Sequence, residues 1–249
     1  MLWGAKVSQY RYVFVIGCAR SGTTAMAKLL NTSAHVCVTN ERFTRLWYHE
    51  IDQCSPALFE AARLMDVRNS DSYASQAYIT DKPKAFAAKC HDAKLIGDKA
   101  PRLHAHLEKM RAIFPGARFV FMLRNIYDVS NSFEARADSG RFWSRQRRTE
   151  DAVREWNASL ENVIGAMGND VFVVCYEEFF HKRRGLAELV QFLHKIPADV
   201  KPKAVYATAS RLNKVKRDRV DSAGRLFIEE NACIDLYLKT LAFWHAWIG

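Results

Sequence analysis

The sequence predicts an α/β fold of three layers, α/β/α, around a central and mostly parallel sheet. Apolar runs that lack alternation are typical of strands buried on both faces, and helical patterns separate these runs. The predicted strands cover residues 10–17, 35–38, 94–97, 118–123 and 170–175. The predicted helices cover residues 102–113, 126–136, 150–167 and 185–194, and a further helix follows the first strand and ends near Asn31. Strands that alternate with helices favour a parallel sheet covered on both faces.

The length of the chain predicts its organisation. Its 249 residues, 49% of them hydrophobic, suffice for one sizeable domain and are few for two. We expect a single domain over residues 1–249, with a core from about 10 to 195 and a helical, basic C-terminal portion from 196 to 249. Two polar stretches, 67–84 and 137–148, are expected to form surface loops.

The charge of the chain restricts the classes of ligand. Lysines and arginines outnumber aspartates and glutamates by 37 to 27, which gives a formal net charge of +10. This charge suits a polyanionic ligand, a nucleic acid or an acidic membrane surface, and does not choose among them. The apolar run at 12–19 is too short for a membrane span and carries no basic leader or signal-peptidase site. We therefore expect a cytoplasmic protein without a transmembrane segment.

Six cysteines are spread along the chain, several of them inside apolar runs, and none forms a Cys-x-x-Cys pair. They are Cys18, Cys37, Cys54, Cys90, Cys175 and Cys233. This distribution predicts reduced, buried thiols and neither a disulfide framework nor a metal site.

A glycine-containing loop joins the first predicted strand to the first helix. It consists of Gly17, Cys18, Ala19, Arg20, Ser21, Gly22, Thr23 and Thr24. Glycines five positions apart between a strand and a helix allow backbone N–H groups to surround a phosphate, and the helix N-terminus adds its positive end. In a nucleoside-triphosphate P-loop a lysine would occupy the position of Thr23, whereas the only cation in this loop is Arg20. The spacing alone is also compatible with a simple chain reversal.

The run Arg20-Ser21-Gly22-Thr23-Thr24 after an apolar strand resembles the 5′-phosphosulfate loop of sulfotransferases. It is most similar to the branch that contains tyrosylprotein sulfotransferases and bacterial carbohydrate sulfotransferases. The resemblance implies a P-loop-type fold and the donor 3′-phosphoadenosine 5′-phosphosulfate (PAPS), which leaves adenosine 3′,5′-bisphosphate as product. It also implies that the loop backbone, Arg20 and the loop hydroxyls hold the 5′-phosphosulfate, and that no metal is needed.

A second anion site is predicted after the strand at 118–123, where Arg124 is followed eight positions later by Ser132. Sulfotransferases have an arginine and a serine in this arrangement, which implies that Arg124 and Ser132 hold the 3′-phosphate of the donor. The alternative for Arg124 is a surface ion pair with Asp128. By the same resemblance Tyr176, after the last strand, contacts the adenosine, for which an aromatic face is suited.

The acceptor hydroxyl loses a proton as it attacks, so a general base must lie near the loop. Glu41 follows the second strand, and Asn40-Glu41-Arg42 resembles the segment that carries the catalytic glutamate of the tyrosylprotein branch. The alternatives are a solvated Glu41 paired with Arg42 or Arg45, and a histidine base, His104 or His106.

Lys99 lies in Gly97-Asp98-Lys99-Ala100-Pro101, which resembles the Asp/Lys-Pro element of sulfotransferases, whose lysine approaches the transferred group. Charge develops on the bridging oxygen as its bond to sulfur breaks, so Lys99 and Arg20 would stabilise the transition state. Catalytic roles are therefore predicted for Glu41, Arg20 and Lys99.

These residues predict a sulfotransferase that acts on an acceptor hydroxyl by in-line displacement, with a carbohydrate or glycolipid acceptor and a bacterial origin favoured by the branch. A phenol and a peptide tyrosine stay open, because acceptor specificity lies in loops that carry no readable code. One rival is a P-loop phosphotransferase that uses ATP and magnesium, with Asp98 as the metal ligand. Another is a nucleic-acid-binding module that uses the basic run at 141–148. The basic stretch at 211–219 is compatible with a loop over the ligands and with a solvated face.

Overall fold

The computed structural model describes residues 11–72, 83–140, 143–194, 199–214 and 218–249. Its centre is a five-stranded sheet in the order β2-β3-β1-β4-β5, and all neighbouring strands pair in parallel. The strands are β1 (Arg11–Gly17), β2 (Val36–Asn40), β3 (Leu95–Lys99), β4 (Arg118–Leu123) and β5 (Val171–Cys175). The predicted fold class and all five predicted strands are confirmed.

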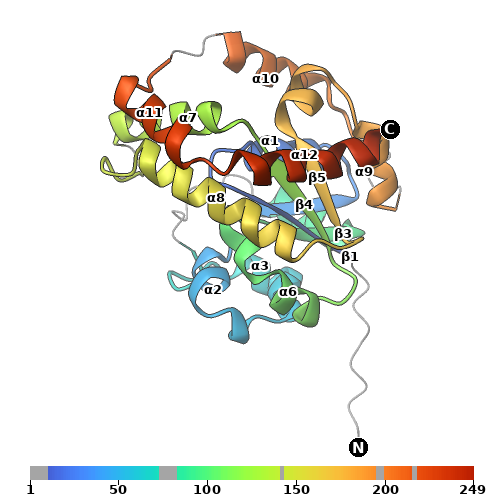
Figure 1. The fold of residues 1–249 in the computed structure, drawn as a ribbon. Coiled ribbons are helices and arrows are strands. Elements are labelled where there is room, and N and C mark those ends of the chain that lie inside the picture. The colour runs from blue at the N-terminus through green and yellow to red at the C-terminus, as the bar shows by residue number, and fades with distance from the viewer. Residues whose placement is uncertain (1–10, 73–82, 141–142, 195–198, 215–217) are drawn as a thin grey trace, which may run out of the picture.

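Helices surround the sheet (Figure 1). They are α1 (Thr23–Leu30), α2 (Thr44–His49), α3 (Ala61–Met65), α5 (Pro83–Asp92), α6 (Leu107–Ile113), α7 (Ile126–Ser139), α8 (Thr149–Gly165), α9 (Leu186–Phe192), α10 (Lys203–Lys214), α11 (Ser222–Asn231) and α12 (Ile234–Ile248). Short 3-10 turns form η1 (Ile51–Gln53), η2 (Pro56–Phe59) and η3 (Pro101–His106), and η4 (Glu177–His181) is a π-helical turn. The helix predicted at 102–113 is therefore a 3-10 turn followed by α6.

The two predicted loops are shorter than expected. Helix α5 begins at Pro83, and α7 continues to Ser139, where Gly140 ends it with a φ of 58°. Residues 73–82 and 141–142, within the two predicted loops, lie outside the described part of the chain.

The C-terminal portion packs onto the core. Helix α12 lies beside α8 and β5 (Figure 1), and the buried Trp244 of α12 contacts Phe172 of β5 edge-on, with ring centroids 6.2 Å apart. Helix α10 packs against α1 and η4. None of the helices in the described residues combines the length and hydrophobicity needed to cross a lipid bilayer.

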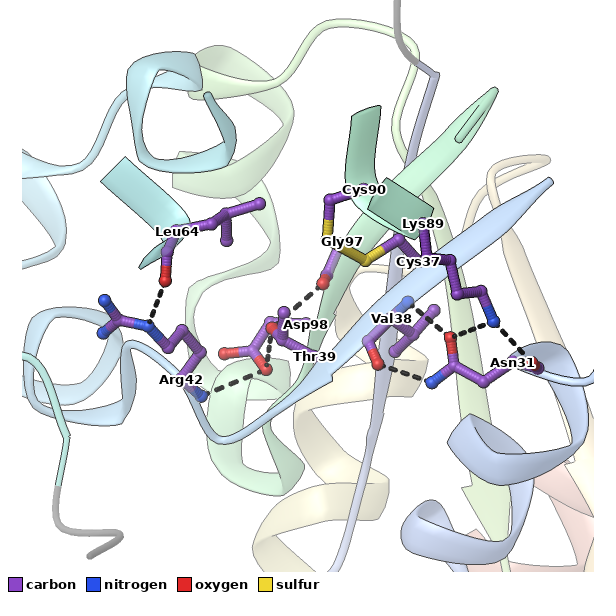
Figure 2. The surroundings of a disulfide bond; sticks show 10 residues. All are labelled: Asn31, Cys37, Val38, Thr39, Arg42, Leu64, Lys89, Cys90, Gly97 and Asp98. Carbon is purple, nitrogen blue, oxygen red and sulfur yellow. Dashed lines mark hydrogen bonds between the residues drawn. A yellow bond between two sulfur atoms is a disulfide. The ribbon is translucent and has the colours of Figure 1, made fainter. Parts of the chain in front are cut away.

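One expectation about the cysteines is wrong. Cys37 of β2 and Cys90 of α5 form a disulfide, with their Cα atoms 5.4 Å apart (Figure 2). Helix α5 packs along the edge strand and so brings together two residues 53 positions apart, which no local pattern reveals. Cys18, Cys54 and Cys175 are buried free thiols, as expected, and Cys233 is a half-buried one.

The backbones of β1 and β3 approach so closely at Gly97 that adding a single methyl group there should destabilise the protein. A Cβ atom on Gly97 would lie 1.7 Å from the carbonyl oxygen of Val13, on the neighbouring strand β1. We expect Gly97→Ala to lower the free energy of unfolding by at least about 3 kcal/mol, because two central strands would have to separate. Gly165→Ala at the end of α8 is the control, since its Cβ would meet no atom within 4 Å. Equal denaturant midpoints for the two variants would contradict this prediction.

Candidate active site

A cavity of about 420 Å³ opens at the carboxyl edge of the sheet. It lies between the loop after β1, the ends of β2, β3 and β4, and one side of α10. Its lining consists of Ala19, Arg20, Gly22, Thr23, Thr24, Ala25, Lys28, Glu41, Lys99, Pro101, Arg124, Trp143, Tyr176, Ala204, Val205, Thr208, Ala209 and Leu212. Segments from nearly the whole length of the chain therefore meet in one place.

The loop after β1 needs both of its glycines. Gly17 has a φ of 137°, and a Cβ there would lie 2.7 Å from the carbonyl oxygen of Met122. Gly22 has a φ of 101°, and its Cβ would lie 2.3 Å from the ring of Tyr176. Both positions therefore combine a left-handed backbone with a close neighbour, which only glycine tolerates.

The loop also presents groups that suit an anion. Arg20 has a φ of 70°, and its side chain lines the cavity. The hydroxyl oxygen of Ser21 is buried and has no hydrogen-bond partner among the described residues. Thr23 and Thr24 begin α1 at the cavity wall, where the helix dipole adds positive potential. Gly17, Cys18 and Ser21, which the sequence also assigns to the anion site, do not line the cavity.

Arg124 lies at the end of β4, where the sequence predicts it. Its guanidinium lies 4.3 Å from the centre of the Tyr176 ring, and its Nη1 donates to the carbonyl oxygen of Arg20 at 3.1 Å. Its Nε is buried and has no partner among the described residues. The expected alternative contact with Asp128 is also present, at 3.5 Å. Burial is the main cause that lowers the pKa of Arg124, although an arginine stays charged at neutral pH.

The structure connects the two predicted anion sites. Ser132 does not line the cavity, but its hydroxyl oxygen accepts a hydrogen bond from Nε of Arg20 at 2.9 Å. Tyr176 is buried between Gly22 and the Arg124 guanidinium. Trp156 is a buried core residue whose Nε1 donates to the carbonyl oxygen of Arg124 at 2.9 Å and so supports the second site.

Glu41 and Lys99 form an ion pair in the cavity wall. Lys99 is only 2% exposed, whereas the side chain of Glu41 is 40% exposed and reaches solvent. The backbone N–H of Glu41 donates to the carbonyl oxygen of Lys99 at 2.9 Å. Arg42, one of the two alternative partners of Glu41, instead pairs with Asp71 at 2.7 Å. The ion pair thus places the Glu41 carboxylate, a possible proton acceptor, next to the ammonium of Lys99 in the cavity wall.

Asp98, the metal ligand in the phosphotransferase alternative, does not line the cavity. It is fully buried, and both of its carboxylate oxygens accept hydrogen bonds from protein groups. Within the described ranges, no group of three histidine, cysteine or acidic side chains is placed to hold a metal ion.

The alternative histidine bases lie elsewhere. His104 and His106 border a separate depression beside α8 and do not line the cavity. His104 is buried, with its Nδ1 3.2 Å from the side-chain nitrogen of Asn162. Burial, with smaller contributions from Arg102 and His106, lowers the pKa of His104 to about 4.

Much of the predicted basic surface is neutralised within the chain. Arg147 pairs with Glu155, and Arg148 pairs with Glu134. Arg219 donates to Asp138 of α7 at 2.8 Å and does not line the cavity. Arg141 and residues 215–217 lie outside the described residues.

Sequence reasoning missed one wall of the cavity. Helix α10 contributes its apolar side through Ala204, Val205, Thr208, Ala209 and Leu212. These residues lie one and three positions apart in alternation, which places them on one side of a helix. The sequence therefore shows an amphipathic pattern, but no local signal indicates which surface this side of the helix covers. Lys28 and Trp143 were missed for the same reason.

A family model described as the sulfotransferase family matches residues 12–194. The chain belongs to this family. The match covers about three quarters of this sulfotransferase and includes Arg20, Glu41, Lys99, Arg124, Ser132 and Tyr176, whereas α10 lies beyond it.

Two solved sulfotransferase domains share the fold. The sulfotransferase domain of the Synechococcus PCC 7002 olefin synthase is 18% identical, with a TM-score of 0.51 over 99% of this chain and 98% of that chain. The sulfotransferase domain from the curacin biosynthetic pathway is 17% identical, with a TM-score of 0.53 over 89% and 97% of the respective chains. A comparison with curated proteins finds no match.

The burial of His104 predicts a pH dependence of stability. Its pKa of about 4 lies below the ordinary value of 6.5, so between these values the unfolded chain binds a proton that the folded chain does not. Its contribution of about 3 kcal/mol to the free energy of unfolding is therefore present above pH 6.5 and lost as the pH falls toward 4. We expect His104→Gln to flatten the pH dependence of denaturant midpoints, and His91→Gln, on an exposed part of α5, to leave it unchanged. Parallel curves for His104→Gln and the wild type would refute this.

Proposed function

We propose that this sulfotransferase uses PAPS as its donor and transfers the sulfuryl group to a hydroxyl of a carbohydrate or glycolipid, with Glu41 as the general base. The observation that carries the proposal is that one cavity brings together the loop cation Arg20, the strand-end cation Arg124 and the Glu41–Lys99 pair. A 3′,5′-bisphosphate nucleotide needs two cationic sites and a reaction centre, and the cavity offers all three.

The groups that would hold the donor fit its chemistry. Nε of Arg124, a buried atom of a residue that lines the cavity, has no hydrogen-bond partner among the described residues, and a phosphate oxygen would provide one. The loop backbone, Arg20, Thr23 and Thr24 would hold the 5′-phosphosulfate, and Arg124 with Ser132 the 3′-phosphate. Tyr176 lines the same cavity and contacts both regions, and we assign it to the contact with the adenosine.

When bound, PAPS would supply the sulfuryl group together with a good leaving group. Glu41 would take the proton of the acceptor hydroxyl as the oxygen–sulfur bond forms. Because that proton neutralises Glu41, the ammonium of Lys99 loses its ionic partner at the moment when charge develops on the leaving oxygen. Lys99 and Arg20 would then stabilise that charge as fixed cations in a partly buried cavity.

The acceptor class follows from the branch that the loop resembles and from the cavity wall. Trp143 and Pro101 line the same cavity as Glu41. Trp143 is fixed by Nε1, which donates to the carbonyl oxygen of Arg147 at 3.0 Å, and by an edge-on contact with Phe133. An aromatic ring in the wall suits packing against the apolar C–H face of a saccharide ring. The proposal also includes a single domain over 1–249, supported by the packing of α10 and α12 onto the core.

The donor assignment predicts a preference in binding. We expect calorimetry at moderate salt to show that adenosine 3′,5′-bisphosphate binds without added metal, and more tightly than ATP with magnesium. Arg124→Ala should weaken this binding roughly 10- to 100-fold, because it removes a charged hydrogen-bond donor. Arg118→Ala, at the opposite end of β4, is the matched control and should bind normally. A preference for magnesium-ATP would overturn the donor assignment.

The base assignment predicts a loss of turnover without a loss of donor binding. We expect Glu41→Gln to lower kcat by about 10²- to 10⁴-fold in assays with labelled donor and a panel of saccharide and phenol acceptors. Arg20→Ala should also abolish turnover, whereas Glu50→Gln, an exposed carboxylate after α2, should not change it. Undiminished turnover in Glu41→Gln would exclude Glu41 as the base.

A further inference from the structure

Asp98 is the residue before Lys99 in β3, and it is 0% exposed. Its Oδ1 accepts hydrogen bonds from the Thr39 hydroxyl at 2.7 Å and from the backbone N–H of Arg42 at 3.2 Å. Its Oδ2 accepts from the backbone N–H of Phe43 at 3.3 Å and from Nε1 of Trp47 at 2.9 Å. Figure 2 shows the carboxylate between Thr39 and the backbone nitrogen of Arg42.

The four donors bracket Glu41 in the sequence. Thr39 lies two positions before it, Arg42 and Phe43 follow it directly, and Trp47 lies six positions after it. The pairing of β2 with β3 sets Asn40 opposite Lys99, and the N–H of Glu41 continues this pairing to the carbonyl oxygen of Lys99. Glu41 is therefore the single residue between Asn40, the last paired residue of β2, and the N–H groups of Arg42 and Phe43, which donate to Asp98.

Glu41 occupies a backbone conformation that needs such support. Its φ of 59° lies in the left-handed region, which costs a residue with a Cβ about 1–2 kcal/mol. Such a conformation persists where the surrounding contacts determine it. The contacts here are the bonds to Asp98, together with a bond from the Ser72 hydroxyl to the carbonyl oxygen of Glu41.

We propose that Asp98 is a positioning residue of the sulfotransferase reaction: its buried carboxylate holds the turn after β2 so that the Glu41 side chain meets Lys99 in the cavity. The inference rests on the proposed function, because it assumes that Glu41 acts as the base. A carboxylate is required, since four donors converge on its two oxygens. An amide would direct its NH2 group at two of these donors.

The test compares Asp98→Asn, Glu41→Gln and the double variant. We expect Asp98→Asn to lower kcat by about 10²-fold, the loss that a displacement of about 1 Å produces, with the affinity for adenosine 3′,5′-bisphosphate unchanged. The double variant should be no slower than Glu41→Gln, because Asp98 acts through Glu41. Asp170→Asn is the control, since Asp170 is a hydrogen-bonded carboxylate at the opposite edge of the sheet, paired with Arg111. It should lower stability and leave kcat unchanged.

Two milder variants serve if Asp98→Asn does not fold. Thr39→Val and Trp47→Phe each remove one bond to Asp98, and each should lower kcat several-fold in the wild type and not at all in Glu41→Gln. A normal kcat in these variants, or losses that multiply with that of Glu41→Gln, would overturn the inference.

A structural readout separates this inference from the proposed function. A crystal structure of Asp98→Asn, or of the milder variants, that retains the left-handed Glu41 paired with Lys99 overturns the role of Asp98. Full turnover in Glu41→Gln overturns the base assignment instead. In that case a displaced Glu41 in crystals of Asp98→Asn would still support the positioning role of Asp98.

Discussion

Parallel pairing of the five strands is the constraint on which the site depends. Because every strand runs in the same direction, all carboxyl ends lie at one edge of the sheet, and the loops that follow the strands begin there. The register sets Val15 of β1 opposite Lys99 of β3, and Asn40 of β2 opposite the same lysine. On the other side, Gly17 pairs with Met122, two residues before Arg124. The loop, the ion pair and the second cation thus meet through backbone hydrogen bonds, before any side chain contributes.

The cavity concentrates positive charge beside a single carboxylate of its lining. Arg20, Lys28, Lys99 and Arg124 line it together with Glu41. Buried charges are unfavourable unless they are paired, and the structure partly meets this need through the Lys99–Glu41 pair, the Arg20–Ser132 bond and the contact of Arg124 with Tyr176. A polyanion would satisfy the remaining donors. These cationic groups are those that would bind a sulfate donor, and the net charge of +10 strengthens this attraction.

Rigid support surrounds the residues that would carry the reaction. Asp98 holds the turn after β2, Trp156 holds the carbonyl of Arg124, and Tyr176 packs against Gly22. The α10 side of the cavity has another origin, because this helix lies outside the residues that match the family model. The core of the site is thus built from the segment that matches the family, whereas α10 closes the cavity from beyond that segment.

The sequence by itself determined what depends on near neighbours: the five strands, the glycine loop with Arg20, and polar residues directly after the strands. Spacing and hydrophobic pattern record such features, because strand burial and phosphate-loop geometry are local. The contact of Glu41 with Lys99, the Cys37–Cys90 disulfide, the burial of Asp98 away from the cavity and the wall from α10 were decided only by the tertiary structure. Each joins segments from about 50 to nearly 200 residues apart, and the packing that unites them is set by the order of strands in the sheet, which no local pattern encodes.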